Sequence, residues 1–422
     1  MMDRFDRQVR IAGWRQELFQ QATVAVHGRS WPGCLVVWGL ANLGIGQIAW
    51  IGRPEAETNV LANWILATPC PIPNCTIVDY PCAVEYGPEL KWALDERPLS
   101  ALLDCGEDPH EAALCQAYAS KRGTPVWFGT TAEGGWIGTA PVAPSATAPP
   151  HAVTAMLVAA LLIDLVREAI CPLHLSRKPR LGRLDLVTPG SNRRGNVVLV
   201  GVGGIGVYGA LLAAQAGFRL GLVDLDHVEE SNLNRQGLFT PQDAAQRVPK
   251  AEAAEKALLR LFPRAQITSW VTRLDRSSKD RLTAFKPSIL VSAVDNAATR
   301  LVLQALGQEL GVPVVQGGTD LFAADCFTQE VGGPLLDAQM HGALSEAAVR
   351  EQSQPRRHGT CAADPSYVVP GMMSGALIAH RMTQALELYH GLGPIRWRAG
   401  ELPHEQRLPT PYEFDLDNCH IR

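Results

Sequence analysis

The sequence lacks a concentration of positive charge. Lysine and arginine total 38 residues against 42 aspartates and glutamates, and the formal net charge is −4. Nucleic-acid-binding domains carry a strong basic footprint, so this balance argues against a nucleic-acid partner. One basic cluster, which we interpret as part of a solvated linker, comprises Arg177, Lys178, Arg180, Arg183, Arg193 and Arg194.

The sequence also lacks an apolar run that could cross a membrane. The run at residues 152–163 is too short and is followed directly by Asp164 and Arg167, so we interpret it as a buried helix. The first residues are polar, without the apolar stretch of a secretory signal. We therefore expect a cytoplasmic protein with no membrane partner.

Cysteine pairs of the metal-binding type are scarce. The ten cysteines do not have the spacing of a small disulfide scaffold, which suits a reducing cytoplasm. Cys70 and Cys75 have a metal-like spacing, but no matching second pair lies downstream. This absence argues against zinc at that pair.

What the sequence does contain is enough apolar material for two domains. Its 422 residues exceed one comfortable core, and 46% of them are hydrophobic while 19% are charged. From about Gly195, strand-like and helix-like segments alternate, which predicts a mostly parallel α/β sheet whose ligands bind at the carboxyl ends of its strands. Strands are expected at residues 197–200, 220–223, 266–271, 289–293 and 312–316, and helices at 207–216, 250–261 and 297–310.

The N-terminal half repeats this order of strands and helices, but in a degenerate form. The matching pairs of segments are 23–28 with 197–201, 99–104 with 287–292, 112–123 with 298–311, 125–129 with 313–317, and 153–169 with 371–388. The turn after the first strand contains Trp31 and Pro32, which obstruct the approach of a phosphate to the backbone. The pattern indicates a duplication in which one half has lost its site, with a linker rich in Pro, Arg and Gly at residues 172–194.

The most informative segment is the turn Gly201-Val-Gly203-Gly204-Ile-Gly206. Its glycines permit a tight turn and a close approach of backbone amides to phosphate oxygens, and the next helix presents its positive N-terminus. Asp224, about twenty residues on, can accept hydrogen bonds from ribose hydroxyls. NAD-dependent oxidoreductases share this pattern, so the turn alone leaves the nucleotide open.

Polar donors after the second strand discriminate between nucleotides. Asn232, Arg235 and Gln236 follow that strand, and Lys250 adds a cation at the head of the next helix. A triphosphate that is being cleaved needs such groups, because charge builds on the departing pyrophosphate. An NAD-dependent oxidoreductase would leave the cations unexplained.

An acid suited to a metal follows the strand at residues 289–293. Asp295, beside Asn296, supplies a carboxylate that can hold Mg²⁺ together with phosphate oxygens. These residues therefore favour ATP with Mg²⁺ over NAD.

Together these motifs resemble the E1/ThiF/MoeB superfamily, whose members adenylate the C-terminal glycine of ubiquitin-like or sulphur-carrier proteins. The resemblance implies ATP and Mg²⁺ as cofactors. The motif residues it assigns to the cofactor are Gly201, Gly203, Gly204, Gly206, Asp224, Asp226, Asn232, Asn234, Arg235, Gln236, Lys250, Asp295 and Asn296. The resemblance extends to the N-terminal segment around Arg7, and in the family this arginine reaches across a dimer interface to the partner's ATP. Arg7 is thus expected to reach nucleotide bound by the other half.

The same resemblance implies an α/β fold with two Rossmann-like adenylation domains in one chain, a pseudodimer of one inactive and one active half. The expected boundaries are an inactive domain at 1–171, a linker at 172–194, an active domain at 195–391 and a tail at 392–422. We expect a monomeric pseudodimer, and further dimerisation is left open.

Cys361 is the leading candidate for a catalytic thiol, beside the expected catalytic cations Arg7, Arg235 and Lys250. It lies in a polar loop with three basic neighbours at 356–358, which favour the thiolate. Its place resembles the loop cysteine before the last helix of ThiF- and MoeB-like enzymes. Cys326 is the main rival and Cys419 the third. Residues 333–339, where many members carry their first zinc-binding pair, contain no cysteine, so no zinc is expected.

The leading hypothesis is an E1-like enzyme that adenylates a ubiquitin-like protein, captures it as a Cys361 thioester and passes it to an E2-like protein. Compact E1-like proteins of bacterial ubiquitin-like operons (the Bil type), some implicated in antiphage defence, are similar. The alternative is a sulphur-carrier adenylyltransferase for thiamine, molybdopterin or tRNA thiolation, in which Cys361 would form a persulphide-linked intermediate. An NAD-dependent oxidoreductase is the alternative from another class.

Overall fold

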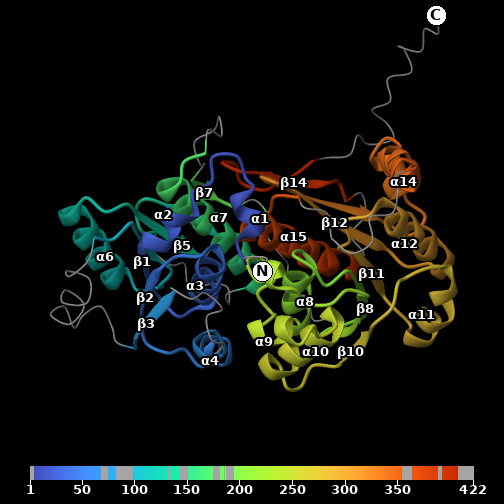
Figure 1. Ribbon diagram of the computed structural model, residues 1–422, viewed down its shortest axis with the longest axis horizontal. Coiled ribbons are helices and arrows are strands. Elements are labelled where there is room, and N and C mark those ends of the chain that lie inside the picture. The colour runs from blue at the N-terminus through green and yellow to red at the C-terminus, as the bar shows by residue number, and fades with distance from the viewer. Residues whose placement is uncertain are drawn as a thin grey trace, which may run out of the picture.

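The computed structural model contains two mixed α/β sheets in one chain (Figure 1). It describes residues 4–67, 75–81, 98–131, 134–142, 151–173, 181–184, 186, 194–353, 364–387 and 392–406, with the backbone alone at 351–353. The first sheet and its helices occupy the left of Figure 1, and the second sheet occupies the right. This architecture confirms the predicted α/β class with two Rossmann-like sheets.

The first sheet has the strand order β3-β2-β1-β4-β5-β6-β7. Its strands are β1 (Thr23–His27), β2 (Gln47–Ile51), β3 (Thr76–Tyr80), β4 (Ala101–Asp104), β5 (Val126–Thr130), β6 (Trp136–Gly138) and β7 (Gly182–Arg183). The first five pair in parallel, and β6 and β7 are antiparallel. Its helices are α1 (Asp6–Val9), α2 (Gln16–Gln21), α3 (Trp31–Leu43), α4 (Asn59–Ala67), α6 (Pro109–Arg122) and α7 (Ala152–Ile170).

The second sheet has the order β10-β9-β8-β11-β12-β13-β14-β15, parallel up to β12 and antiparallel beyond it. Its strands are β8 (Asn196–Val200), β9 (Arg219–Val223), β10 (Ile267–Trp270), β11 (Ile289–Ser292), β12 (Val314–Asp320), β13 (Ala323–Gln329), β14 (Ile395–Arg398) and β15 (His404–Glu405). The helices are α8 (Gly206–Gln215), α9 (Pro241–Ala245), α10 (Lys250–Leu261), α11 (Lys279–Phe285), α12 (Ala297–Leu310), α13 (Leu336–Gln339), α14 (Ala343–Ser353) and α15 (Val368–Leu386), with short 3-10 turns η2 (Glu230–Asn232) and η3 (Arg276–Ser278).

The seven strands of the first sheet match the first seven of the second sheet in order, and β15 is the eighth strand of the second. Val24 of β1 lies opposite Ala101 of β4, and Val197 of β8 lies opposite Ile289 of β11, so the central pairs share one register. The helix that follows each second member of these pairs starts with a side-chain cap and ends at a left-handed glycine, with φ 66° in both halves. The repeat recognised in the sequence is therefore present in the topology.

Long apolar helices join the halves. α7 packs on α3 and on α15, and α15 packs on α8, so a single hydrophobic cluster runs from the first sheet to the second. The expected buried helix at residues 152–163 is the start of α7, and most of that helix is buried. In Figure 1, α15 lies in the middle of the molecule, beneath α1 and beside α8.

Some segments expected to be linker or tail contribute strands. β7 lies within residues 172–194 and extends the first sheet, and β14 and β15 lie beyond residue 391 and extend the second. The reason is that each antiparallel extension offers an edge with backbone groups to pair, and the neighbouring chain satisfies them.

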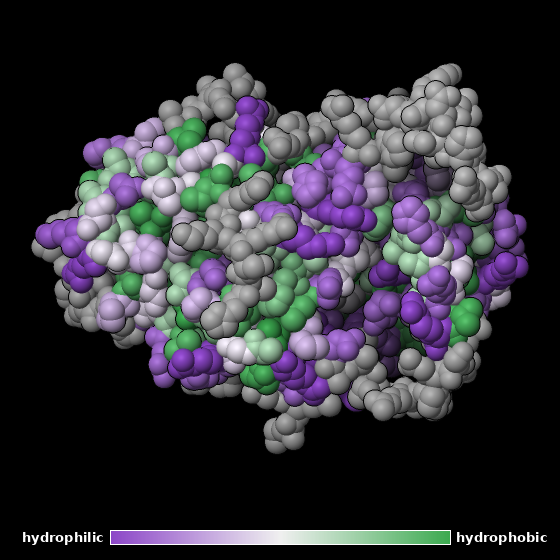
Figure 2. Space-filling view, turned by 90° about the horizontal axis from the view of Figure 1, so that it is seen from above, coloured by the Kyte–Doolittle hydropathy of each residue, from purple (hydrophilic) through white to green (hydrophobic). Residues whose placement is uncertain are grey.

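On the surface seen in Figure 2, apolar residues occur at several separate points among hydrophilic ones. The large apolar side chains exposed in the described part of the chain are single residues such as Val60, Leu225 and Val349. No helix of that part is both long and apolar enough to cross a membrane.

Candidate nucleotide site

The glycine turn at residues 201–206 lies at the carboxyl end of β8 and leads into α8. Gly201 has φ 90°, in the left-handed region that favours glycine. A Cβ there would come within 2.7 Å of the carbonyl oxygen of Ala293, and one at Gly206 would overlap the carbonyl oxygen of Gly201. The fold itself therefore requires these two glycines.

The two middle glycines have a different reason to be glycine. A Cβ on Gly203 would find its nearest neighbour, the Nε2 of Gln236, at 3.9 Å, and a Cβ on Gly204 would find Arg235 Cδ at 3.6 Å. Neither residue has a positive φ. Because packing among the described residues does not exclude a side chain here, these glycines fit a ligand that must approach the backbone closely.

The first half provides an internal control for this interpretation. Gly28 after β1 has φ 98°, and a Cβ there would lie 2.6 Å from the carbonyl carbon of Cys105. A Cβ on Gly33 would overlap the carbonyl oxygen of Gly28, as Gly206 does with Gly201. Counted from these fixed points, Ser30 and Trp31 occupy the places of Gly203 and Gly204. The first half keeps the glycines that the fold needs and lacks the two that a ligand would need.

Other contacts in the first half fill the equivalent crevice. The Arg29 side chain donates to the carbonyl oxygen of Gly52 at 2.6 Å and pairs with Asp79. Gly52 follows β2 as Asp224 follows β9, so a glycine stands in the first half at the place of that acid. Ser30 donates to the carbonyl oxygen of Cys105 at 2.8 Å, which ties its hydroxyl to the turn.

Asp224 supports the glycine turn of the second half. Its carboxylate accepts from the backbone N–H of Val202 at 2.6 Å and from that of Asp226 at 2.8 Å. Burial raises the pKa of Asp224, and the nearby charge of Lys250 opposes that rise. Lys250 is 4% exposed and its Nζ donates to Asp226 at 3.0 Å. The turn, the two acids and the lysine thus form one connected site.

The segment at residues 231–236 lies against the glycine turn. Asn232 caps its own 3-10 turn by accepting from the backbone N–H of Glu229 at 3.0 Å. Arg235 lies beside Gly204, and its Nη1 donates to the Ser231 carbonyl at 2.7 Å. Gln236 is 3% exposed, and its Oε1 is buried without a hydrogen-bond partner among the described residues.

Asp295 and Asn296 follow β11 next to this turn. Asp295 is exposed at the carboxyl edge of the sheet, where a metal can reach it. Asn296 is the N-cap of α12, and its side chain accepts from the backbone N–H of Thr299 at 2.8 Å. Asn296 therefore has a structural task, and its predicted contact with the cofactor stays a prediction.

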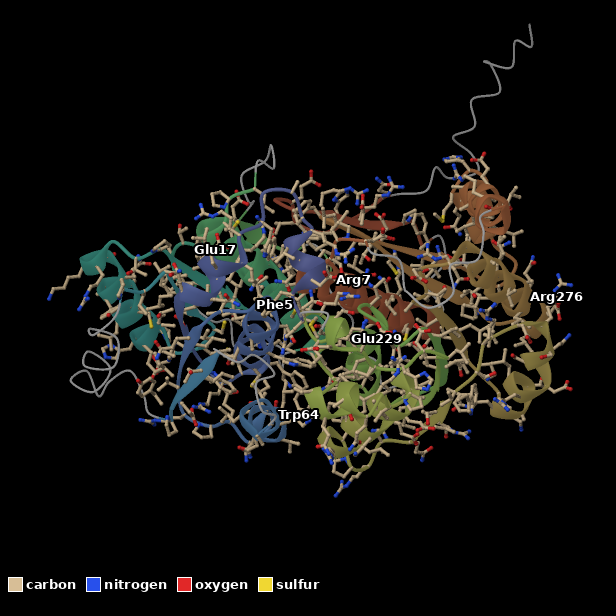
Figure 3. All side chains as sticks on the ribbon, viewed as in Figure 1. Phe5, Arg7, Glu17, Trp64, Glu229 and Arg276 are labelled. Carbon is tan, nitrogen blue, oxygen red and sulfur yellow. The ribbon has the colours of Figure 1, made fainter. Side chains whose placement is uncertain are left out.

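Arg7 comes from the first half and meets the second. It is 6% exposed, its Nη1 donates to the carbonyl oxygen of Asp364 at 3.4 Å, and its own carbonyl accepts from the N–H of Ser366 (Figure 3). Arg7 therefore contacts the segment that precedes α15 of the second half. Contact between Arg7 and a nucleotide stays a prediction.

Of the three candidate thiols, the structure describes only Cys326. Cys361 and Cys419 lie outside the described residues, as does Cys70 of the metal-like pair. Cys326 is in β13 and fully buried, and burial raises its pKa to about 12. A thiol that is inaccessible and protonated is a poor nucleophile, so the geometry weighs against this rival.

The first half contains a charged network that sequence reasoning missed. The ring of His27 lies between Asp104, at 2.7 Å from Nδ1, and Glu111, at 3.0 Å from Nε2. Burial disfavours the charged ring, but its hydrogen bonds with Asp104, Cys115 and Glu111 outweigh the cost of burial and raise the pKa of His27 to about 12. His27, Asp104 and Cys115 also place possible metal ligands within 4.8 Å of one another. Since both ring nitrogens face carboxylates, we interpret the cluster as an ion-pair network. The sequence did contain a signal for this network, because the polar residues His27 and Asp104 end two buried strands that lie side by side.

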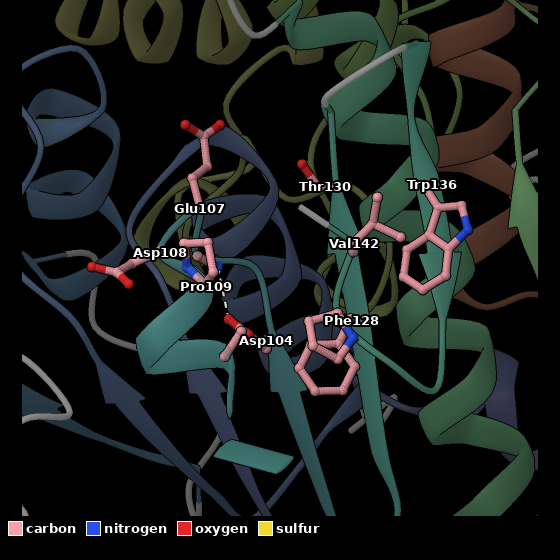
Figure 4. A pocket seen from close by; sticks show the side chains of 12 residues that line it. Asp104, Glu107, Asp108, Pro109, Phe128, Thr130, Trp136 and Val142 are labelled. Atoms are coloured by element: carbon pink, nitrogen blue, oxygen red, sulfur yellow. Dashed lines mark hydrogen bonds between the residues drawn. The ribbon is translucent and has the colours of Figure 1, made fainter. Parts of the chain in front are cut away.

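A pocket open to solvent lies beside this network, at the ends of β4 and β5 (Figure 4). Glu107 and Asp108 line it on the side where α6 begins, and Phe128 and Trp136 line it on the strand side. It corresponds in position to the neighbourhood of Asp295 in the second half.

Known proteins resemble mainly the second half of the chain, which contains the candidate nucleotide site. The ThiF family model matches residues 191–395, which contain the second sheet's glycine turn and its cations. The sulfur carrier protein adenylyltransferase of Thermus thermophilus is 33% identical over 204 residues, which cover 48% of this chain and 71% of that protein. With the glycine turn, acids and cations of the site, these matches define an E1/ThiF/MoeB-type protein. The chain belongs to the ThiF family.

Further relatives match shorter stretches. The SAMP-activating enzyme E1 of Haloferax volcanii is 33% identical over 165 residues, 38% of this chain and 60% of that protein. The sulfur carrier protein ThiS adenylyltransferase of Bacillus subtilis is 32% identical over 127 residues, 30% of this chain and 37% of that protein. Among solved structures, E. coli MccB with ATP has a TM-score of 0.41 at 20% identity, covering 50% of this chain and 64% of that one.

Proposed function

We propose that this protein uses Mg·ATP to adenylate the C-terminal carboxylate of a ubiquitin-fold carrier protein. The observation that carries the proposal is the contrast between the two turns. Gly203 and Gly204 are unobstructed glycines beside Arg235 and Gln236, whereas the first half has Ser30 and Trp31 in their places. Family membership and the adenylyltransferase names of the relatives support the same reaction.

In the proposed reaction, a carboxylate oxygen of the carrier attacks the α-phosphorus of ATP. The bond between that phosphorus and the bridging oxygen breaks, and pyrophosphate leaves with the electron pair. Arg235 and Lys250 would offset the charge on the leaving group, with Arg7 added from the first half. Asp295 would hold Mg²⁺, which neutralises phosphate charge. Asp224 would orient the ribose, although both its oxygens already accept from backbone groups.

The fate of the acyl-adenylate separates two versions of the proposal. In the E1-like version, the thiolate of Cys361 attacks the acyl carbon, AMP leaves, and the thioester passes to an E2-like protein. The presence of two unlike halves in one chain supports this version. In the second version the carrier receives sulphur, and the names of the Thermus thermophilus and Bacillus subtilis relatives support it at least as well. The antiphage role stays a prediction.

We propose further that only the second half binds nucleotide. The first half has Trp31 at the phosphate turn, and its Arg29 side chain is held by the Gly52 carbonyl and Asp79, both unfavourable to a triphosphate. An NAD-dependent oxidoreductase would not need Arg235 and Lys250 and is disfavoured.

ATP–pyrophosphate exchange, measured with candidate ubiquitin-like and sulphur-carrier proteins, tests the proposal. Exchange that depends on a carrier ending in glycine is the expected result, and its absence with every carrier would contradict adenylation. A non-reducing gel then detects a thioester, which Cys361→Ala should abolish while exchange continues. If the adduct persists in Cys361→Ala, the assignment of the thiol is wrong.

A further inference from the structure

We infer that Asn234 is a positioning residue that sets the orientation of Arg235 and ties it to the first half. The inference rests on the proposed nucleotide site. Asn234 is completely buried, with 0% exposure. It directly precedes Arg235 and follows Asn232 by two residues, and both of these belong to the candidate site. Such complete burial of an amide demands hydrogen-bond partners for its donors.

Both amide donors of Asn234 are used by segments remote in sequence. Its Nδ2 donates to Oε1 of Gln8 at 3.0 Å and to the carbonyl oxygen of Ser366 at 3.2 Å. Gln8 is itself fully buried, and its Nε2 donates to Gln16 at 3.0 Å and to the Leu43 carbonyl at 3.1 Å. The amide group of Asn234 is thus fixed from the first half, through a chain of buried hydrogen bonds.

The remaining polar atom of Asn234 faces the candidate cation. Its Oδ1 accepts from Nη1 of Arg235 at 2.8 Å, and the same Nη1 donates to the Ser231 carbonyl. The two acceptors restrain the guanidinium beside Gly204. A nucleotide contact through Nδ2 would require Asn234 to give up a buried bond to Gln8 or Ser366, so its effect on ATP is expected to pass through Arg235.

Packing supports the same direction of influence. Gly237, next along the segment, is so close to the first half that a Cβ would lie 2.6 Å from the Trp38 ring. Tyr208 of α8 meets the same ring with centroids 5.8 Å apart. The segment at residues 231–236 therefore packs against the first half, and Asn234 makes a polar contact with it through Gln8.

A double-mutant cycle on the full chain tests this, with Mg·ATP binding measured by calorimetry for wild type, Asn234→Ala, Arg235→Ala and the double variant. Asn234→Ala should weaken binding about tenfold, in the range of coupled neighbours. The same change should add less than about twofold when Arg235 is already alanine. An equal loss in both backgrounds would mean that Asn234 contacts the nucleotide itself and would overturn the inference.

Asn196→Ala is the matched control. Its Nδ2 also donates to two carbonyl oxygens, those of Phe285 at 3.0 Å and Lys286 at 2.9 Å, at the opposite end of β8. It should lower the melting temperature without changing ATP affinity. If Asn234→Ala behaves like Asn196→Ala, its role is structural only and the inference fails.

If Asn234→Ala does not fold, Gln8→Ala replaces it in the cycle, since it removes an acceptor of the same amide from the first half. It should weaken Mg·ATP binding only while Arg235 is present, and unchanged affinity would count against the inference. Wild-type protein that binds no Mg·ATP would overturn the proposed function as well. Normal wild-type binding with a failed cycle would overturn the inference alone.

Discussion

Substituting alanine at single glycines of the turn should separate ligand binding from folding. In Gly204→Ala the new methyl group would meet Arg235 Cδ at 3.6 Å and Cγ at 3.7 Å, which is ordinary van der Waals contact. Because the unfolded chain loses freedom and the native backbone can accept alanine, the variant should be as stable as wild type or about 0.4–1 kcal/mol more stable. We therefore expect no loss of folding stability in Gly204→Ala.

Gly204→Ala should, by contrast, weaken nucleotide binding strongly. A methyl group at Gly204 would occupy the space through which a phosphate oxygen approaches the backbone amides beside Arg235. A hydrogen bond to a charged group contributes about 1.5–3 kcal/mol, so losing one should weaken Mg·ATP binding about 10- to 100-fold. The measurement is Mg·ATP titration, together with the melting temperature with and without nucleotide.

Gly206→Ala is the opposite control. Its methyl group would overlap the carbonyl oxygen of Gly201, so it should destabilise the protein by about 1–3 kcal/mol before any ligand is added. Gly33→Ala, which meets the Gly28 carbonyl, should behave likewise in the first half and leave ATP affinity unchanged. Wild-type affinity in Gly204→Ala would refute the ligand explanation, and a strong loss of stability there would refute the packing explanation.

Three further predictions concern charged groups. Asp295→Ala should abolish Mg²⁺-dependent exchange with little change in melting temperature, since the side chain is exposed; retained exchange would remove the metal assignment. Arg7→Ala should lower the rate of exchange at least tenfold, and an unchanged rate would exclude a catalytic contact. His27→Gln should cost about 3–5 kcal/mol of stability, because it leaves two carboxylates without a buried charge. Since the folded pKa is raised from 6.5 to about 12, the stabilisation is complete below pH 6.5 and is lost as pH rises through that window. The melting-temperature gap between wild type and His27→Gln should therefore narrow from pH 6 to pH 10; a constant gap would contradict the charged pair.

Local signals predicted the regular elements of the second half well. Helices expected at residues 250–261 and 297–310 have those bounds in the structure, since Asn296 caps the second and Gly311 ends it. The strand expected at 312–316 is longer, reaching Asp320 as β12, because β13 pairs with it along its whole length. Pairing with a partner strand is not encoded in the local pattern of a single segment.

Cross-half contacts could not be predicted in the same way. The sequence marks Arg7, Asn232 and Arg235 as polar residues of a motif, but it does not say which of them are buried or what faces them. Asn234 looked like one more nucleotide contact, and only the packed molecule places it between Gln8 and Ser366. The His27 network was not predicted either, because it depends on the pairing of β1 with β4 and on the packing of α6, which carries Glu111 and Cys115.

These contacts give the first half a structural role at the candidate site of the second. The segment that carries Arg235 contacts the first half at two points, Asn234 with Gln8 and Gly237 with Trp38. Removing the first half would expose the buried amide of Asn234 and release the guanidinium beside Gly204. A free second half should therefore bind nucleotide poorly even with its glycine turn intact.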